Sequence, residues 1–324
     1  MMPDTRPDLL SPAFRALSAR LGQDPLQVQG PGGNTSIKDD GVMWIKASGT
    51  ELANAETDDI FVEVDHAAAK AEAHGAGDGS CKTTGLDPSV SLRPSIETTF
   101  HAALDHAVVA HTHSVATLTH VISPEGREIA KSKLEGLPFV MVPYAKPGLP
   151  LTGEILARVT PETRIILLQN HGLIACGASV EETADHIAEV EARLAMPVLS
   201  NTRAHPEEPP LEGFAWAPYS WMAMEPRTAS LVKQGSYYPD HVVFLGPGLP
   251  SQDNAANPPA ILRDEGILLR DGATSSQQAM LKCLSDVLSR LPAEWSAEPI
   301  GEAAEAELLD WDAEKYRQAL AARA

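Results

Sequence analysis

The sequence predicts an α/β fold: a mixed, largely antiparallel sheet flanked by helices, followed by a C-terminal α+β extension. Strand-like and helix-like segments alternate through the first two hundred residues. Several successive strands are joined by turns of hairpin length, which suit antiparallel neighbours. After about residue 200 prolines become frequent and periodicity is lost. We therefore expect a first domain over residues 1–200 and an extension over residues 201–324.

Each element follows from a local pattern. Apolar residues recur at helical spacing from Leu10 to Leu21, so a helix is expected there, and Gly22 ends it. The next segments are a hairpin over 36–48 turning at Asp40–Gly41, a strand over 59–64, a glycine-rich loop over 72–92, a helix from Pro94 and a strand over 108–116. Then come a helix over 124–135, a strand over 139–145, a strand over 164–177 that breaks at 170–172, and a helix over 179–195. The extension is expected to contain a linker over 201–220, a strand over 241–246, an apolar helix over 276–291 and an acidic helix over 302–324.

Composition excludes several classes of protein. Hydrophobic residues make up 43% and charged residues 21% of the 324 residues, as in ordinary soluble globular proteins. The net charge of −19 argues against nucleic acid or an anionic membrane as a partner. The three cysteines are far apart and form no CxxC motif, and MMPDTRPDLL does not resemble a signal peptide. We expect a cytoplasmic protein with no membrane or nucleic-acid partner.

Three histidines are candidate metal ligands. In "VVAHTHSVA" (108–116) His111 and His113 are two residues apart on an expected strand, so both side chains would project from one face. His171 lies where "LLQNHGLIACG" interrupts another strand, and Gly172 allows an unusual backbone angle there. Three protein ligands with an open position are typical of catalytic zinc. A structural histidine pair and an ordinary turn histidine are the alternatives.

Glu97 and two glycine-containing loops are further candidates. Glu97 lies in the first turn of the helix expected from Pro94; it would be a metal ligand or a general base, or would only complement the helix dipole. Arg93 could bind an anionic group or lie on the surface. The loop "GPGGNTS" (30–36) lacks the P-loop and dinucleotide-binding spacings, but its N–H groups and side chains suit an anion-binding nest. "ASGT" (47–50) offers the same chemistry.

These motifs carry a resemblance. GGNTS, ASGT, RPSIE, HTHS and NHG occur in this order, and together the sequence resembles the class II aldolase/adducin family. That family includes fuculose-phosphate and rhamnulose-phosphate aldolases, ribulose-phosphate 4-epimerases and related decarboxylases. The sequence is most similar to the aldolase half of bifunctional rhamnulose-phosphate aldolase/alcohol dehydrogenase proteins. The resemblance covers about residues 9–197, and no dinucleotide fingerprint follows, so dehydrogenase activity is not expected.

The resemblance implies a three-layer α/β/α catalytic domain and assigns roles to residues. His111, His113 and His171 would hold about one divalent metal ion per chain, usually zinc, and Glu97 would be the catalytic acid/base. The implied substrate or phosphate pocket consists of Gly33, Asn34, Thr35, Ser48, Gly49, Thr50 and Ser95. The sugar-phosphate aldolases generally have a second serine before the glutamate, where this sequence has Ile96. This difference leaves a carboxylate or an unphosphorylated polyol open as the group bound.

The expected function is therefore that of a class II, metal-dependent aldolase-type lyase. It would cleave a carbon–carbon bond in a small sugar, sugar phosphate or sugar acid through a zinc-stabilised enediolate. Epimerisation and decarboxylation use related chemistry and stay open, as does a non-catalytic, adducin-like binding module. The resemblance also implies a homo-oligomer, with a tetramer preferred and the cleft near a subunit boundary. Aromatic residues of the extension would either bury an interface or pack back on their own domain.

Overall fold

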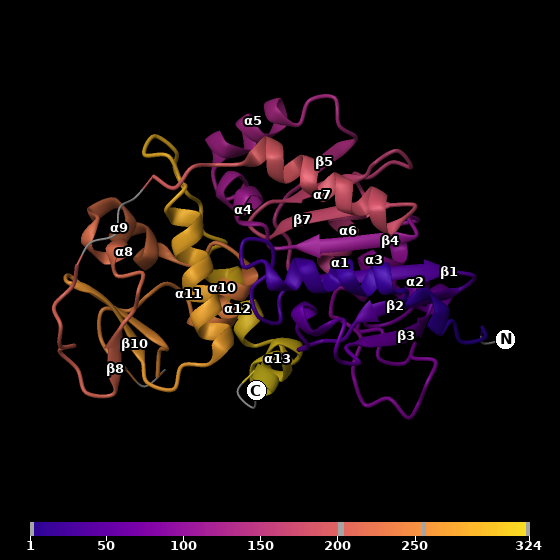
Figure 1. The fold of residues 1–324 in the computed structure, drawn as a ribbon, viewed down its shortest axis with the longest axis horizontal. Coiled ribbons are helices and arrows are strands. Elements are labelled where there is room, and N and C mark those ends of the chain that lie inside the picture. The colour runs from indigo at the N-terminus through magenta and orange to yellow at the C-terminus, as the bar shows by residue number, and fades with distance from the viewer. Residues whose placement is uncertain (1–2, 200–203, 255–256, 322–324) are drawn as a thin grey trace.

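A seven-stranded mixed sheet forms the centre of the first domain (Figure 1). The computed structural model describes residues 3–199, 204–254 and 257–321. The strand order is β3-β2-β1-β4-β7-β6-β5, and all neighbours are antiparallel except the parallel pair β5–β6. The strands are β1 (Asn34–Asp39), β2 (Val42–Lys46), β3 (Phe61–Asp65), β4 (Val108–Thr112), β5 (Phe139–Val142), β6 (Ile165–Leu168) and β7 (Gly172–Gly177). The predicted mixed, largely antiparallel sheet is confirmed.

Helices cover both faces of this sheet, which makes the three layers. Alternate residues of β6 point to opposite faces: Ile165 packs toward α4, α5 and α7, whereas Ile166 packs toward α3 and α6. The helices on the first face are α1 (Pro12–Gln23), α4 (Val115–Val121), α5 (Pro124–Lys133) and α7 (Val180–Leu194). Those on the second face are α2 (His66–Ala73), α3 (Thr98–Ala103) and α6 (Leu149–Leu156). In addition, two short 3-10 helices span Pro7–Leu9 and Leu52–Asn54.

The C-terminal region packs onto one end of the first domain (Figure 1). It contains a three-stranded antiparallel sheet in the order β8-β10-β9. Its elements are β8 (Phe214–Trp216), α8 (Trp221–Met224), α9 (Pro226–Gln234), α10 (Pro239–Leu245), β9 (Ala260–Arg263), β10 (Gly266–Arg270), α11 (Ser275–Leu288), α12 (Glu302–Leu309) and α13 (Asp312–Ala321). Tyr237 and Phe244 are buried in one apolar cluster with Leu118 and Leu173 of the first domain. These aromatic residues therefore pack back on their own chain, and the domain boundary near residue 200 stays a prediction.

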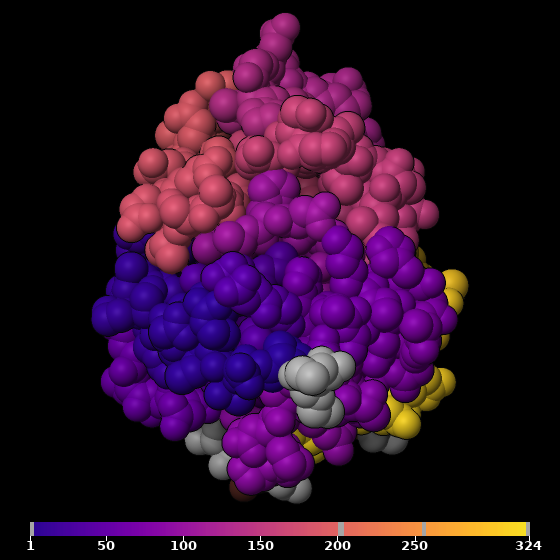
Figure 2. Space-filling model, turned by 90° about the vertical axis from the view of Figure 1, so that its right-hand side faces the viewer, coloured from indigo at the N-terminus to yellow at the C-terminus, as the bar shows by residue number. Residues whose placement is uncertain are grey.

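The C-terminal region leaves the opposite face of the first domain largely uncovered (Figure 2). Figure 2 shows that the face turned away from the C-terminal region consists almost wholly of residues before 200, with the yellow C-terminal helices only at its rim. No helix among the described residues combines the length and the apolar character needed to cross a membrane.

The strand predicted over 241–246 is wrong, because residues 241–245 belong to helix α10 and Gly246 is its C-cap. Pro239 occupies the first turn, where its missing N–H is harmless, and Gly246 ends the helix with φ +88°. Every residue of α10 is buried, so apolar side chains lie on all sides and no helical period is visible in the sequence. The acidic C-terminal segment is also divided, into α12 and α13, at 310–311.

Two boundaries near the histidines differ from the prediction as well. Strand β4 ends at Thr112, and the Ser114 hydroxyl accepts the backbone N–H of Thr117 and begins α4. The helix expected from Pro94 begins only at Thr98. Its start is delayed because Pro94 forms an isolated bridge with Ala47, which holds this part of the chain extended.

Candidate active site

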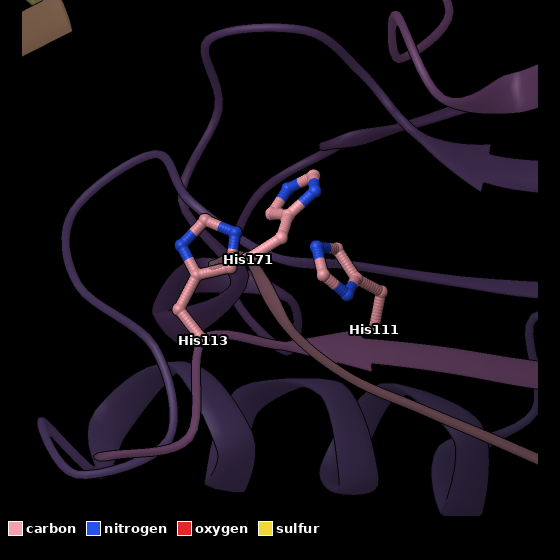
Figure 3. Close-up of side chains that lie close together, drawn as sticks. All are labelled: His111, His113 and His171. Atoms are coloured by element: carbon pink, nitrogen blue, oxygen red, sulfur yellow. The ribbon is translucent and has the colours of Figure 1, made fainter. Parts of the chain in front are cut away.

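Three histidines converge at the ends of two neighbouring strands (Figure 3). His111 lies in β4, and His171 lies just before β7, which is paired with β4. His113 lies one residue beyond β4 rather than on it, yet its ring still meets the other two. The ring centroids are 5.0 Å apart for His111–His113, 4.9 Å for His111–His171 and 5.5 Å for His113–His171. One nitrogen from each ring lies within 4.8 Å of those of the other two, and all three side chains are buried.

The backbone at 170–172 brings His171 to this place. Asn170 has φ +54°, and its Nδ2 donates to the Tyr237 and Glu298 carbonyl oxygens. Gly172 has φ +146°, and a Cβ there would lie 2.3 Å from the Thr112 carbonyl oxygen. Only glycine allows so close an approach of the β7 backbone to the end of β4.

The protonation state of the cluster suits a metal ion. His111 Nδ1 lies 2.9 Å from the Leu173 carbonyl oxygen, so Nδ1–H donates to that oxygen and Nε2 is the nitrogen left to bind a metal. That Nε2 is buried and has no hydrogen-bond partner among the described residues. Burial lowers the pKa of His113 and of His171 to about 3 each, so both rings are neutral at physiological pH. Three converging, buried imidazoles, of which His111 has an unpartnered Nε2 among the described residues, fit a divalent ion.

Glu97 faces two of these histidines. It lies at the N-cap position of α3 rather than in its first turn. Its Oε2 is 3.6 Å from His111 Nε2, and its Oε1 is 3.5 Å from His171 Nε2. Asn34 Nδ2 donates to Oε2 over 2.8 Å, whereas Oε1 is buried without a hydrogen-bond partner among the described residues. One carboxylate oxygen is therefore fixed and the other is available to a ligand or a proton.

A buried histidine that the sequence analysis did not single out orients this carboxylate. His101 Nδ1 lies 2.7 Å from Ser36 Oγ, and its Nε2 contacts Asn34 Oδ1. Burial holds the pKa of His101 well below its ordinary value, so the ring is neutral. Because Nε2–H then donates to Oδ1, the NH₂ group of Asn34 is turned toward Glu97. His101 lies four positions after Glu97, in RPSIETTFH, and no local pattern there indicates this role.

The residues expected to bind phosphate divide into two groups. A cavity of about 30 Å³ lies beside His113 and His171. Its lining includes five of the seven expected residues, namely Gly33, Asn34, Ser48, Gly49 and Ser95. The other two hydroxyls are engaged elsewhere: Thr35 Oγ1 lies 2.7 Å from Ser18 Oγ, and Thr50 Oγ1 donates to the Ala47 carbonyl oxygen over 2.9 Å.

A wider pocket of about 940 Å³ adjoins this cavity and shares Ser48, Ile96 and Pro147 with it. Helices α12 and α13 form one of its walls, and Arg93 contributes to another. The Arg93 guanidinium lies 4.2 Å from the centre of the Tyr316 ring. Arg93 therefore contacts the C-terminal region, and it is not among the residues that line the 30 Å³ cavity beside the histidines.

Three charged residues of the cavity lining were missed. Lys46 is 2% exposed, and its Nζ donates to the Pro31 and Thr50 carbonyl oxygens over 2.7 Å each, which ties together the two glycine-containing loops. Burial lowers the pKa of Lys46 to about 7. Asp240 of α10 and Arg317 of α13 reach the same cavity from the C-terminal region. A lysine inside an apolar strand was a usable signal for Lys46, whereas no local pattern marks Asp240 or Arg317.

Comparison with known proteins places this site in a family. The model of the Class II Aldolase and Adducin N-terminal domain matches residues 15–198. The uncharacterized oxidoreductase YuxG of Bacillus subtilis is 32% identical over 180 residues, which are 50% of this chain and 25% of YuxG. The 3-oxo-tetronate 4-phosphate decarboxylase of Escherichia coli O6:H1 is 31% identical over 112 residues, 31% of this chain and 52% of the enzyme. The chain thus spans a quarter to about half of the length of these two relatives.

A solved structure agrees with the sequence comparisons. The N-terminal class II aldolase domain of a conserved protein from Thermoplasma acidophilum superimposes with a TM-score of 0.51 at 28% sequence identity. The superposition covers 59% of this chain and 94% of that domain. The residues that the family model matches, 15–198, contain the central sheet and all three histidines. The chain belongs to the class II aldolase and adducin N-terminal domain family.

Proposed function

We propose that the protein is a metal-dependent lyase that cleaves a carbon–carbon bond in a small sugar, sugar phosphate or sugar acid. The observation that carries the proposal is the buried cluster of His111, His113 and His171 with the Glu97 carboxylate beside it. Three imidazole ligands leave a coordination position open, as in catalytic zinc sites. A divalent ion bound there would act as a Lewis acid on a carbonyl oxygen of the substrate.

Glu97 is proposed as the acid/base. When an aldol bond is cleaved, the carbon that keeps the bonding electron pair must later gain a proton, and a positioned carboxyl group can deliver it. Asn34 holds Oε2, so Oε1 is the oxygen left to exchange that proton. The neutral His101 supports the arrangement, because it fixes the amide of Asn34 without adding a charge.

Access to this site involves the C-terminal region. The cavity beside the histidines is too small for a sugar, and Arg317 lines it. The wider pocket leads up to it and is walled by α12 and α13. We therefore include in the proposal that α13 moves when a substrate of several carbon atoms binds.

Decarboxylation is the second candidate, because a decarboxylase is among the relatives of this chain. The same residues would serve it, since loss of carbon dioxide also leaves an electron pair that needs a proton. A non-catalytic binding role is disfavoured, because a protein-binding module has no need of three buried histidines around a carboxylate.

The proposal extends to the setting of the protein. We propose a cytoplasmic homo-oligomer, with a tetramer preferred, that acts on a small molecule and binds neither nucleic acid nor membrane. A neighbouring subunit is not needed to close the active site, because Asp240 and Arg317 of the same chain line the cavity beside the histidines. Light scattering at micromolar concentration tests the oligomer, and a fully active monomer would exclude a shared site.

The decisive experiment combines metal analysis with a substrate panel. The purified protein should contain about one divalent ion per chain. Ketose phosphates, aldonates and their unphosphorylated forms are then incubated with it, and release of an aldehyde or of carbon dioxide separates the two reactions. Protein without bound metal after incubation with zinc would contradict the proposal.

Glu97→Gln should keep the metal and lose about 10²- to 10⁴-fold in kcat, the usual contribution of a general acid/base. Glu128→Gln is the matched control, because Glu128 is exposed and its one ion pair among the described residues is with the neighbouring Lys131. A Glu97→Gln protein with the turnover of the control would leave Glu97 without a catalytic role.

A further inference from the structure

A carboxylate from the C-terminal region points at the histidine cluster. Asp240 is 2% exposed, and its Oδ2 lies 3.4 Å from His113 Nδ1. That nitrogen is itself buried and has no hydrogen-bond partner among the described residues. In Figure 3 one ring nitrogen of His113 faces the other two imidazoles and the second faces away from them. Asp240 thus lies next to a ring nitrogen that nothing else described in the structure satisfies.

Arg317 fixes the position of Asp240. Its Nη1 donates to Oδ1 over 2.9 Å and its Nη2 donates to Oδ2 over 3.2 Å, so the two side chains form a bidentate pair. Glu314, one turn earlier in α13, accepts a second bond from Nη1 over 2.8 Å. Both Asp240 and Arg317 are buried. A buried guanidinium keeps the carboxylate ionised and limits it to one orientation.

The first glycine-containing loop leaves room for this contact. A Cβ at Gly32 would lie 2.8 Å from Asp240 Oδ2 and 2.9 Å from His113 Nδ1. Both atoms therefore lie against the same bare stretch of backbone. Gly32 belongs to GPGGNTS but is not among the residues expected to bind phosphate. The close contact with Asp240 and His113 gives a reason for a glycine at this position.

We propose that Asp240, held by Arg317, is a positioning residue for His113 as a metal ligand. A histidine that binds a metal through one nitrogen commonly donates its other N–H to a carboxylate, which fixes the tautomer and strengthens the ligand. Leu173 gives His111 a comparable anchor through its carbonyl oxygen. The C-terminal region is then a part of the metal site and not only a cover over it. This inference rests on the proposed metal-dependent function.

The test is the zinc affinity of the full-length protein. Metal is removed with a chelator, and the zinc dissociation constant is measured by competition with a chromogenic chelator at pH 7.5. Asp240→Asn should weaken zinc binding about 10- to 100-fold, the usual effect of removing a partner of a ligand. Glu305→Gln is the matched control, because Glu305 is a buried carboxylate of α12 that accepts the Ser236 N–H and is not among the residues that line the histidine cavity. Its zinc affinity should stay within about threefold of wild type.

Gly32→Ala is the second variant, and it keeps every charge. Its methyl group would separate Asp240 Oδ2 from His113 Nδ1, so zinc binding should weaken here too. This variant decides the question if Asp240→Asn does not fold, as judged by circular dichroism. Wild-type affinity in folded Asp240→Asn or, failing that, in Gly32→Ala would overturn the inference, as would equal losses in Asp240→Asn and Glu305→Gln.

The two proposals fail in different ways. If wild-type protein binds no zinc, the proposed function fails before any variant is compared. If wild-type protein binds zinc and Asp240→Asn binds it equally well, only the role of Asp240 is refuted. The zinc affinity is independent of turnover, so neither result depends on finding the substrate.

Discussion

Replacing Gly172 by alanine tests how the fold places the third histidine. The residue has φ +146°, which side chains rarely adopt, and this alone should cost about 1–2 kcal/mol. The new Cβ would lie 2.3 Å from the Thr112 carbonyl oxygen, whereas ordinary contact begins near 3.4 Å. The ends of β4 and β7 must therefore separate by about 1 Å, and forced shifts of this kind typically cost a further 1–3 kcal/mol or so. We expect Gly172→Ala to lower the free energy of unfolding by about 2–5 kcal/mol.

The same shift moves His171 relative to His111 and His113. Functional groups must be held to within about 0.5 Å, so zinc affinity should fall at least about tenfold. Gly136→Ala is the control, because Gly136 has φ +85° and a Cβ there would meet nothing within 4 Å. Gly136→Ala should lower the free energy of unfolding only by the cost of the unfavourable φ, about 1–2 kcal/mol, and should leave the zinc affinity unchanged. Urea unfolding and chelator competition measure both quantities. Equal stability and equal zinc affinity in the two variants would refute the reasoning.

Two further predictions concern buried titratable groups. Burial lowers the pKa of His120 to about 4 and that of His241 to about 3, so both rings stay neutral in the folded chain while the unfolded chain binds protons below about pH 6.5. Their stabilising contribution is complete above pH 6.5 and is lost as the pH falls toward 4 and 3; at pH 5 the loss is about 2 kcal/mol per ring. Urea unfolding at pH 7.5 and 5 should show this loss of stability, and His120→Phe should make the loss smaller. The same pH dependence of stability in wild type and His120→Phe would contradict the role given to His120. Lys46→Met should leave the Pro31 and Thr50 carbonyl oxygens without their buried donor and lower the free energy of unfolding by about 2 kcal/mol, measured against Lys131→Met at an exposed site. Equal stability of the two lysine variants would show that Lys46 does not hold these loops.

Local patterns in the sequence predicted the seven strands of the first domain and its helices α1, α3, α5 and α7, but not α2, α4 or α6. Alternating strands and helices predicted the mixed sheet, and the Asp40–Gly41 turn between β1 and β2 was expected from its residues. The interrupted strand at 170–172 was also expected, and Gly172 has the unusual backbone angle predicted for it. These features could be predicted because each depends on residues that are close together in the chain. The family resemblance then supplied candidate roles for the three histidines and Glu97.

Only the tertiary structure decided how the site is completed. Asp240 and Arg317 are 77 positions apart, and His101 is 67 positions from Asn34, so no local window contains either pair. The run 241–246 has strand-like residues, but residues 241–245 form part of helix α10, which is buried on all sides and carries Asp240 to His113. A period in the sequence reveals an element only when one of its faces meets water. Elements buried on every side, and polar contacts between distant segments, are fixed by packing, and packing is decided only when the whole chain has folded.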